Sequence, residues 1–410
     1  MAGPLVGIRV VDLATTLTGP TATRYLADYG ATVVRVETTR HPDTLRYSGP
    51  FGAGLATVDS SGYYAAFNTG KYSIALDLDQ PGGRELFARL VRWADILVES
   101  FTPRVMRRWG LDYRALSDIK PDLIMASTCQ QGQTGPRAEY AGYGYHGAAL
   151  AGLNELTGWP DREPVGPYSA YTDFTGWGFL LVGLLAALDY RRRTGHGMYI
   201  DQSQYESALQ FLGPALLDYL ANGKVAARNG NRDAVFVPNG VYPCASVAER
   251  PSEAGEWVAV TVRSDDEWRG LCRGMGRADW SQDPSLGTVA GRRGREGAID
   301  DGIAAWTSAR PRAEVCAALR KHGVVCEEVL SPAELLEDAQ LLHREHFRRL
   351  EHPVLGGYLC HTSCFRLSAT PAEVGRRAAR LGEDTEHVLR DFLGIGEAEL
   401  ARYAAAGVFT

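Results

Sequence analysis

Short β-branched runs alternate with helical segments over the first part of the chain, and this alternation restricts the fold more than any other feature. Ile8–Leu13 is followed by a Thr/Gly/Pro-rich loop, a helical segment over Ala22–Tyr29 and a second apolar run, Thr32–Glu37. Gly30 stands where that helix should end. Three further runs are predicted strands: Asp95–Val98, Leu123–Thr128 and Met198–Asp201. Strands joined through helices run parallel, so the sequence predicts an α/β fold with a parallel sheet.

Loops that follow parallel strands collect ligands, which raises the question of a dinucleotide. The Gly-x-Gly-x-x-Gly fingerprint is absent from the loop after Ile8–Leu13. Glu37, at the end of the second predicted strand, is the only residue of the dinucleotide pattern that remains. The sequence therefore does not support NAD or FAD binding.

The stretch Tyr168–Phe179 places one carboxylate, Asp173, among hydroxyls, aromatic rings and two glycines. The apolar run Phe179–Leu188 follows at once and predicts a buried helix, since all its faces are apolar. A carboxylate just before a buried helix is stabilised by the positive end of the helix dipole, and glycines let a substrate approach the backbone. Two interpretations stay open, a catalytic carboxylate and a simple helix cap.

The middle of the chain has a different pattern. Ser203–Leu220 is mostly helical and is expected to leave the first domain. Trp257–Val262 alternates like a strand, and three helical segments follow, which predicts a smaller α+β domain over about 225–328. Ser331-Pro-Ala-Glu334 is a capping box that starts a new helix, and a closing helix is expected over Glu397–Ala405.

Composition excludes several classes of protein. The net charge of −6 argues against a general nucleic-acid binder. Seven cysteines without a paired framework suit a reducing compartment, and the Cys360, His361 and Cys364 group lacks the second ligand pair of a zinc site, so no metal is predicted. The N-terminal sequence has no signal-peptide pattern, and the longest apolar run, ten residues, is too short to span a bilayer. We expect a cytoplasmic protein.

Several stretches in order along the chain resemble the family III CoA-transferases, a carnitine-dehydratase-like group that includes formyl-CoA transferase and benzylsuccinate CoA-transferase. The stretches that carry the resemblance are GIRVVDLATTLTGP, LADYGATVVRVE, NTGKYSIALDLDQPGGRELFARLV, ADILVESFTPRVMRRWGL, QGQTGP, GWPDREPVGPYSAYTDF, LAALDYRRRTGHGMYIDQSQYESAL, PNGVYPC and FRLSATPA with LGEDTEHVL. They cover nearly the whole chain.

The resemblance implies a large Rossmann-like domain built from both chain ends and a smaller α+β middle domain, in an interlocked dimer. The implied bounds are 1–200 for the first part of the large domain, 201–224 for a linker helix, 225–328 for the small domain and 329–410 for the return to the large domain. A homodimer is expected, and a heteromer with a paralogue is the alternative.

The resemblance also implies site residues. The nucleophilic aspartate of the family falls on Asp173. The positions that contact CoA fall on Leu17, Thr18, Leu76, Asp77, Leu78, Asp79, Ser100, Phe101, Thr102, Arg108 and Tyr143. Three arginines, Arg104, Arg107 and Arg108, and Lys71 are further candidates for the CoA phosphates, since such cations bind phosphate oxygens.

The resemblance implies an acyl-CoA:carboxylate CoA-transferase that works through an aspartyl-CoA thioester on Asp173, with acyl-CoA as a substrate and no permanently bound cofactor. Backbone N–H groups near Gly176 and Gly178, or in the Asn229–Arg232 or Asn239-Gly240 loop, are candidates to stabilise the oxyanion. Two alternatives stay open. One is an acyl-CoA racemase or isomerase, disfavoured because Tyr143 stands where that branch has histidine, and the other is a non-catalytic CoA-binding subunit.

Overall fold

The computed structural model describes residues 3–246 and 255–410. The chain forms two compact units, which we describe separately. Unit 1 comprises residues 1–155, 165–226 and 339–410, and unit 2 comprises residues 156–164 and 227–338. Asp173 and all the residues expected to contact CoA belong to unit 1.

Unit 1 is built on a six-stranded sheet in which every pair of neighbours is parallel. Its strands, in the order in which they lie side by side, are β3 (Lys71–Ala75), β2 (Thr32–Glu37), β1 (Arg9–Asp12), β4 (Ile96–Glu99), β5 (Ile124–Cys129) and β6 (Met198–Ser203). The predicted α/β class is confirmed. The sequence analysis assigned no strand at β3. Lys71 and Ser73 are polar, although both are buried, so the segment lacks the apolar pattern of a buried strand.

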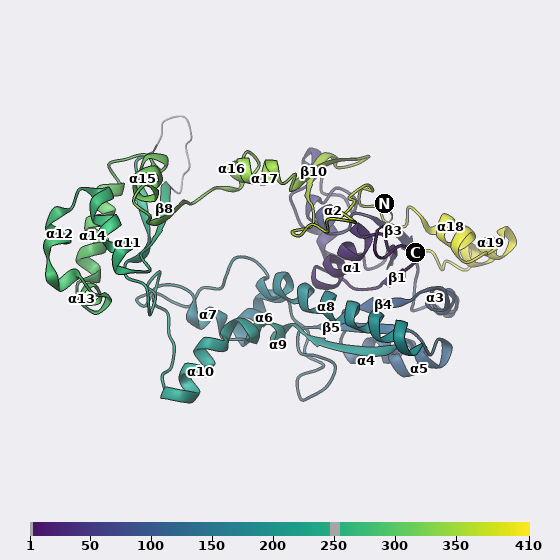
Figure 1. The fold of residues 1–410 in the computed structure, drawn as a ribbon. Helices are drawn as coiled ribbons and strands as arrows, with labels where there is room; N and C mark the ends of the chain where they lie inside the picture. The colour runs from purple at the N-terminus through teal and green to yellow at the C-terminus, as the bar shows by residue number, and fades with distance from the viewer. Residues whose placement is uncertain (1–2, 247–254) are drawn as a thin grey trace. The chain divides into compact units, whose positions relative to one another are not determined.

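Helices cover both faces of this sheet, and each layer has its own apolar core (Figure 1). On one face, α1 (Thr18–Asp28) and α8 (Tyr171–Thr194) pack side chains such as Leu26 and Leu184 against Val10 and Val98. The other face is covered by α3 (Pro81–Trp93), α5 (Tyr113–Ile119) and α19 (Glu397–Ala405). Five shorter helices complete the N-terminal part: α2 (Gly62–Phe67), α4 (Pro103–Trp109), α6 (Gly144–Leu150), α7 (Leu153–Leu156) and α9 (Gln204–Leu209).

Helix α8 begins at Tyr171 and is longer than the predicted apolar run. Leu180, Leu184 and Ala187 are buried, but Val182 is 67% exposed and Leu185 is also exposed, so the expectation of a buried helix is wrong for the side that carries Val182 and Leu185. By length and composition it is the one helix in the described ranges that would suffice to cross a membrane, but its buried side belongs to the sheet core. Helix α10 (Gly213–Asn222) buries no residue at all.

The C-terminal segment packs against the N-terminal sheet (Figure 1). The N–H of Asp384 donates to the carbonyl of Ser73, and that of Asp77 donates to the carbonyl of Val408. This segment contains α17 (Ala339–His343), α18 (Thr385–His387) and an antiparallel hairpin that the sequence analysis did not predict, β10 (Phe347–His352) with β11 (Gly356–His361). The predicted closing helix matches α19.

Unit 2 has an antiparallel sheet in the order β7 (Asn239–Cys244), β8 (Glu256–Thr261) and β9 (Val325–Glu328). Its helices are α11 (Asp265–Met275), α12 (Ala278–Gln282), α13 (Val289–Gly294), α14 (Glu296–Thr307), α15 (Arg312–Arg320) and α16 (Pro332–Leu335). Val258, Trp268 and Leu319 lie in its core. The predicted capping box is present at α16, where the N–H of Ser331 donates to the carboxylate of Glu334.

Candidate functional site

The loops expected to contact CoA lie at one edge of the unit 1 sheet. Leu17 and Thr18 follow β1, residues 76–79 follow β3, and residues 100–102 follow β4, so all three groups lie at carboxyl ends of parallel strands. The strand order reverses between β1 and β4, which is the topological switch point where open α/β sheets bind ligands. The N–H of Thr15 donates to Ser100 Oγ at 2.8 Å and joins the two loops at this point.

Asp173 lies in the first turn of α8 and is only 6% exposed. The capping position is occupied by Ala170, so Asp173 is not the cap of its own helix. Its Oδ2 instead accepts a hydrogen bond from the N–H of Gly144, the first residue of α6, at 3.4 Å. The carboxylate therefore lies where the positive ends of two helices meet.

Thr18 and Gln204 connect Asp173 to two further helices. Thr18 Oγ1 donates to the backbone carbonyl of Asp173 at 3.1 Å and accepts from Gln204 Nε2 at 2.8 Å. Thr18 begins α1 and Gln204 begins α9, so helix N-termini from four parts of the chain surround the aspartate. The sequence analysis did not single out Gly144 or Gln204 for a role at Asp173, because only the fold brings them there.

The pKa of Asp173 is raised from 3.8 to about 6. Burial is the main cause, and hydrogen bonds from the N–H of Gly144 and from Gln204 and Thr18 offset part of it. A carboxyl group with this pKa is about nine-tenths ionised at pH 7 and retains more basicity than an exposed aspartate. Such a perturbed, buried group at a ligand-binding edge is typical of functional sites.

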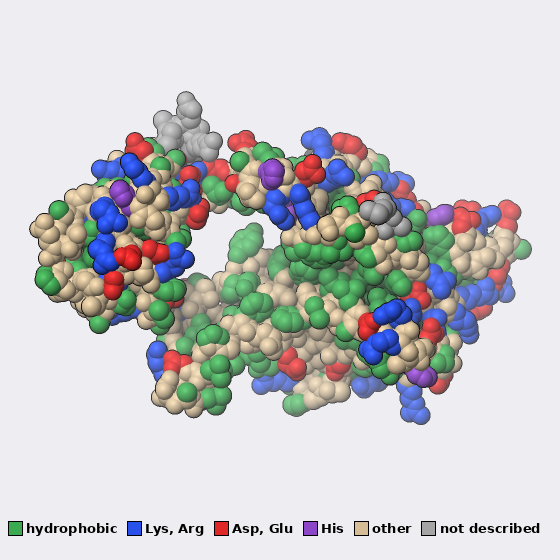
Figure 2. Space-filling view, viewed as in Figure 1, with side chains coloured by type: hydrophobic (Ala, Val, Ile, Leu, Met, Phe, Trp, Pro, Cys, Tyr) green, Lys and Arg blue, Asp and Glu red, His purple; other side chains and the backbone are tan. Residues whose placement is uncertain are grey.

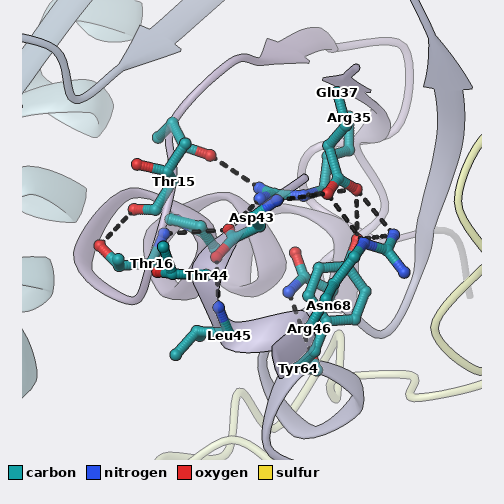
Figure 3. A network of polar contacts seen from close by, with 12 residues as sticks. Thr15, Thr16, Arg35, Glu37, Asp43, Thr44, Leu45, Arg46, Tyr64 and Asn68 are labelled. Atoms are coloured by element: carbon teal, nitrogen blue, oxygen red, sulfur yellow. Dashed lines mark hydrogen bonds and ion pairs between the residues drawn. The ribbon is translucent and has the colours of Figure 1, made fainter. Parts of the chain in front are cut away.

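A buried polar network fixes the loop between β1 and α1 (Figure 3). Arg35 donates to Asp12 at 3.2 Å, to the carbonyl of Ala14 at 2.8 Å and also to Asp43. Asp43 in turn accepts the N–H of Thr16, whose φ of 63° is unusual for a residue other than glycine. These bonds hold the backbone immediately before Leu17 and Thr18.

Glu37 belongs to the same network and not to a nucleotide site. Its carboxylate accepts from Arg46 Nε at 2.8 Å and from Tyr64 at 2.7 Å (Figure 3). Burial opposes ionisation of Glu37, but Arg46 and Arg35 outweigh it and hold its pKa below the usual range. Its oxygens are engaged inside the protein, so a ribose has no free acceptor there.

Phe101, in the loop after β4, is held at both of its backbone polar groups. Its N–H donates to Glu99 Oε2 at 2.7 Å, and its carbonyl accepts from Gln133 Nε2 at 2.9 Å. Gln133 is itself fixed, because its N–H donates to Asp201 at 2.8 Å. Glu99 is fully buried, and burial raises its pKa to about 7.

The remaining expected CoA contacts differ in accessibility. Leu17, Leu76, Asp77 and Leu78 are buried, whereas Ser100, Phe101 and Thr102 are half-buried. Asp77 pairs with Arg40 at 3.2 Å. Tyr143 caps α6, directly before Gly144, and is 55% exposed.

The four candidate cations separate into two groups. Lys71 is buried, and its Nζ donates to Asp12 at 2.8 Å, to the carbonyl of Pro20 at 2.8 Å and to Asn68 at 2.9 Å. Its three N–H groups are therefore used inside unit 1, and we leave Lys71 out of the proposed phosphate site. Arg104, Arg107 and Arg108 are exposed on α4, where Arg108 pairs with Asp79 at 3.4 Å.

Four of the expected oxyanion donors lie in regular structure. Gly176 and Gly178 are inside α8, where each N–H is engaged in the helix, so the idea that they form an oxyanion loop is wrong. Asn239 and Gly240 belong to β7, and Gly240 pairs with Val260. Near Asp173, the fold supplies the N–H of Gly144 as a backbone donor.

Comparison with known proteins shows which family this chain belongs to. Residues 5–385 match the model of the family described as CoA-transferase family III. The succinyl-CoA–D-citramalate CoA-transferase of Chloroflexus aurantiacus is 31% identical over 405 residues, which cover 99% of this chain and 98% of that protein. The succinyl-CoA–L-malate CoA-transferase alpha subunit of the same organism is also 31% identical, covering 97% of this chain and 91% of the subunit.

A solved structure has the same fold. The crystal structure of a CAIB/BAIF family protein from Brucella suis superimposes with a TM-score of 0.85 at 29% sequence identity. It covers 96% of this chain and 100% of the Brucella chain.

Proposed function

The chain belongs to CoA-transferase family III, and we propose that it transfers CoA from an acyl-CoA to a free carboxylic acid through an aspartyl-CoA thioester on Asp173. The family assignment predicted from the sequence motifs is confirmed by the match over residues 5–385. The finer points, namely the covalent intermediate and the CoA contacts, rest on the geometry of the site.

The position of Asp173 is the observation that supports this proposal. Its carboxylate is buried, accepts the N–H of Gly144 and has a pKa raised to about 6. A nucleophilic carboxylate must be ionised and still basic enough to attack, and this environment provides both properties near neutral pH.

In the first half-reaction, Asp173 attacks the carbonyl carbon of the donor thioester and expels CoA as its thiolate. The product is a mixed anhydride between Asp173 and the donor acyl group. The thiolate then attacks the aspartyl carbonyl, which releases the donor acid and leaves an aspartyl-CoA thioester. The energy of the thioester is conserved, because one activated carboxyl group is exchanged for another.

In the second half-reaction, the acceptor carboxylate attacks the aspartyl-CoA thioester and forms a second mixed anhydride and free thiolate. The thiolate attacks the acceptor carbonyl, which yields the new acyl-CoA and restores the Asp173 carboxylate. Each tetrahedral intermediate carries an oxyanion, and we propose the N–H of Gly144 as a donor to the oxyanion that forms on the aspartyl carbon.

CoA is proposed to bind along the carboxyl edge of the sheet. The loops at Leu17–Thr18, 76–79 and 100–102 follow β1, β3 and β4, and we propose that they contact CoA. The exposed arginines of α4, Arg104 and Arg108, are proposed to meet its phosphates, and Tyr143 to border the channel toward Asp173.

The contacts of His146 weaken the racemase alternative. His146 is the histidine closest in sequence to Tyr143, the position at which the racemase branch has its histidine. His146 is engaged in the capping of α6, where its Nδ1 accepts the N–H of Tyr143 at 3.3 Å. A racemase base must reach the α-carbon of the substrate, and the proposed transfer needs no such base.

The active assembly is proposed to be a homodimer that is interlocked, with a heteromer as the alternative, because one similar protein is named as an alpha subunit. All seven cysteines are free, in agreement with the proposed cytoplasmic location. We propose no permanently bound cofactor, since the carboxylate chemistry requires only the two substrates.

Mass spectrometry of the trapped intermediate tests the mechanism. Succinyl-CoA, the donor named in the similar proteins, is incubated with the protein and then with hydroxylamine, followed by digestion. We expect a hydroxamate on the peptide that contains Asp173, and no such product with the Asp173→Asn variant. A panel of acceptor acids then identifies the second substrate. If a donor–acceptor pair supports efficient CoA transfer but no hydroxamate forms on Asp173, the proposed mechanism is overturned.

A further inference from the structure

A cavity of unit 1 lies between α17, the β10–β11 hairpin and the segment after β11, away from the site at Asp173. Its volume is about 500 Å³. The side chains that line it and carry the argument are Arg344, His346, Phe347, Arg348, Phe365 and Arg366. Neither Asp173 nor any residue expected to contact CoA lines it.

Positive charge prevails in this cavity. It is lined by three guanidinium groups, of Arg344, Arg348 and Arg366, but by only one carboxylate, Glu345. Figure 2 shows cationic and histidine side chains gathered over α17 and the adjoining part of β10. An uncompensated group of cations in a concave site concentrates anions there.

Two of the three guanidinium groups are free to bind a ligand. Arg366 donates to the backbone carbonyl of Arg344. Within residues 3–246 and 255–410, the guanidinium groups of Arg344 and Arg348 form no hydrogen bond or ion pair, and both side chains are exposed. An arginine fork can bind two oxygens of one carboxylate or phosphate group.

One histidine of the cavity lining contacts a second, more deeply buried histidine. The rings of His346 and His361 stack with centroids 6.4 Å apart, and Arg24 Nη1 donates a hydrogen bond to His361 Nε2 at 2.9 Å. Burial, together with Arg344 and Arg24, lowers the pKa of His346. Burial, Arg24 and His346 lower the pKa of His361 to about 4. The carboxylate of Asp28 pairs with Arg24 at 3.5 Å, so Arg24 has its own counter-charge, and the positive charge open to a ligand is that of the lining arginines Arg344 and Arg348.

We propose that this cavity binds a small organic anion that has several acidic oxygens and an apolar body. The guanidinium groups of Arg344 and Arg348 bind the acidic oxygens, and the rings of Phe347 and Phe365 and the side chain of Leu342 contact the apolar part. Dicarboxylic acids and phosphomonoesters share this chemistry. The site is separate from Asp173 and does not depend on the proposed transferase mechanism.

Titration calorimetry with succinate and with inorganic phosphate tests the proposal and distinguishes the two sources of anion. The test variant is Arg344→Ala/Arg348→Ala. The matched control is Arg349→Ala, because Arg349 is the next residue of β10 but does not line the cavity and instead pairs with Glu351 at 3.4 Å. We expect at least one anion to bind, tenfold or more weaker to the test variant, and with unchanged affinity to the control.

The imidazole of His346 provides a second readout. An anion held beside it favours the charged ring, so saturation with the bound anion should raise the pKa of His346 in a histidine NMR titration. Selective binding of phosphate or of succinate would assign the chemical class. Absence of binding by both anions at millimolar concentration, equal weakening in the test variant and the control, or an unchanged His346 titration would each overturn the proposal. The anion should also bind to the Asp173→Asn variant. Binding to this variant would show that the anion site does not depend on the proposed transferase function.

Discussion

The N–H of Gly144 donates to the Asp173 carboxylate across two helices, with 3.4 Å between the nitrogen and Oδ2. The two residues are 29 positions apart in sequence. A side chain at position 144 would collide with this arrangement, since its Cβ would lie 2.5 Å from the carbonyl oxygen of Ala170 and 2.9 Å from Cγ of Asp173. The observed position of the Asp173 carboxylate therefore requires glycine at position 144.

Gly144→Ala tests this condition. We expect the added methyl group to displace Asp173 and lower kcat by at least tenfold, while the affinity for CoA changes little. The control is Gly183→Ala in α8, where the new Cβ meets only Ile200 at 3.6 Å, an ordinary contact. Steady-state kinetics of both variants decide the question, and equal activity of Gly144→Ala and wild type would refute the positioning role.

Asp173→Asn should lower kcat by several orders of magnitude, because the amide cannot act as the nucleophile. The same variant should be more stable than wild type at pH 8. The folded-state pKa of about 6 lies above the ordinary 3.8, so the folded protein binds the proton more tightly, and ionisation destabilises it as the pH rises from 3.8 to 6. At higher pH the full effect is on the order of 3 kcal/mol.

Urea unfolding of wild type and Asp173→Asn at pH 5 and pH 8 measures this effect. The gain in the free energy of unfolding should be larger at pH 8 than at pH 5. A variant that is less stable than wild type at pH 8 would show that the carboxylate has a structural role instead.

The pH dependence of kcat/KM should have an acid limb near pH 6. Protonation removes the nucleophile, and burial raises the pKa of Asp173 to about 6, so the rate should fall about tenfold for each further pH unit below this value. The measurement is made with a substrate acid whose own pKa lies well below 5. A limb centred near pH 4 would indicate an unperturbed carboxyl group.

Arg108→Ala should weaken the binding of CoA. The guanidinium is largely exposed and already lies 3.4 Å from Asp79, so the expected loss is about 1 kcal/mol, roughly fivefold in Kd. Titration calorimetry with CoA measures it, with Arg192→Ala as the control, since Arg192 pairs with Asp189 at the far end of α8. Equal affinities of both variants and wild type would exclude Arg108 from the site.

The apolar outer surfaces of α8 and α10 should be covered in a dimer. Val182 on α8 is 67% exposed and Leu220 on α10 is 78% exposed, together with further apolar side chains of both helices. Large exposed apolar patches mark surfaces that bind another chain. Light scattering at micromolar concentration should give about twice the chain mass of 44.6 kDa. Val182→Glu should reduce the dimer fraction or the stability, whereas Val6→Glu, at a comparably exposed valine elsewhere, should not. A wild-type mass near 44.6 kDa would contradict the dimer.

Much of the fold could be predicted because its signals are local. β2 and α19 both have the predicted bounds. β3 was not predicted, because the polar residues Lys71 and Ser73 interrupt the apolar pattern that indicates a buried strand. Their polar atoms are satisfied by Asp12 and Gly382, which only the folded chain brings to them.

The candidate site, like the fold, could be predicted only in part from the sequence. The sequence by itself determined the α/β class, the family and the candidate nucleophile, since these depend on periodicity and on motifs within short stretches. It also proposed Lys71 as a phosphate ligand and Gly176 and Gly178 as oxyanion donors, because side-chain charge and glycine content do not reveal burial or helix bounds. Only the tertiary structure decided that Lys71 is engaged inside unit 1, and that Gly144 and Gln204 meet at Asp173. Hydrogen bonding and desolvation depend on distances between atoms far apart in the chain, and packing of the helices on the sheet sets those distances.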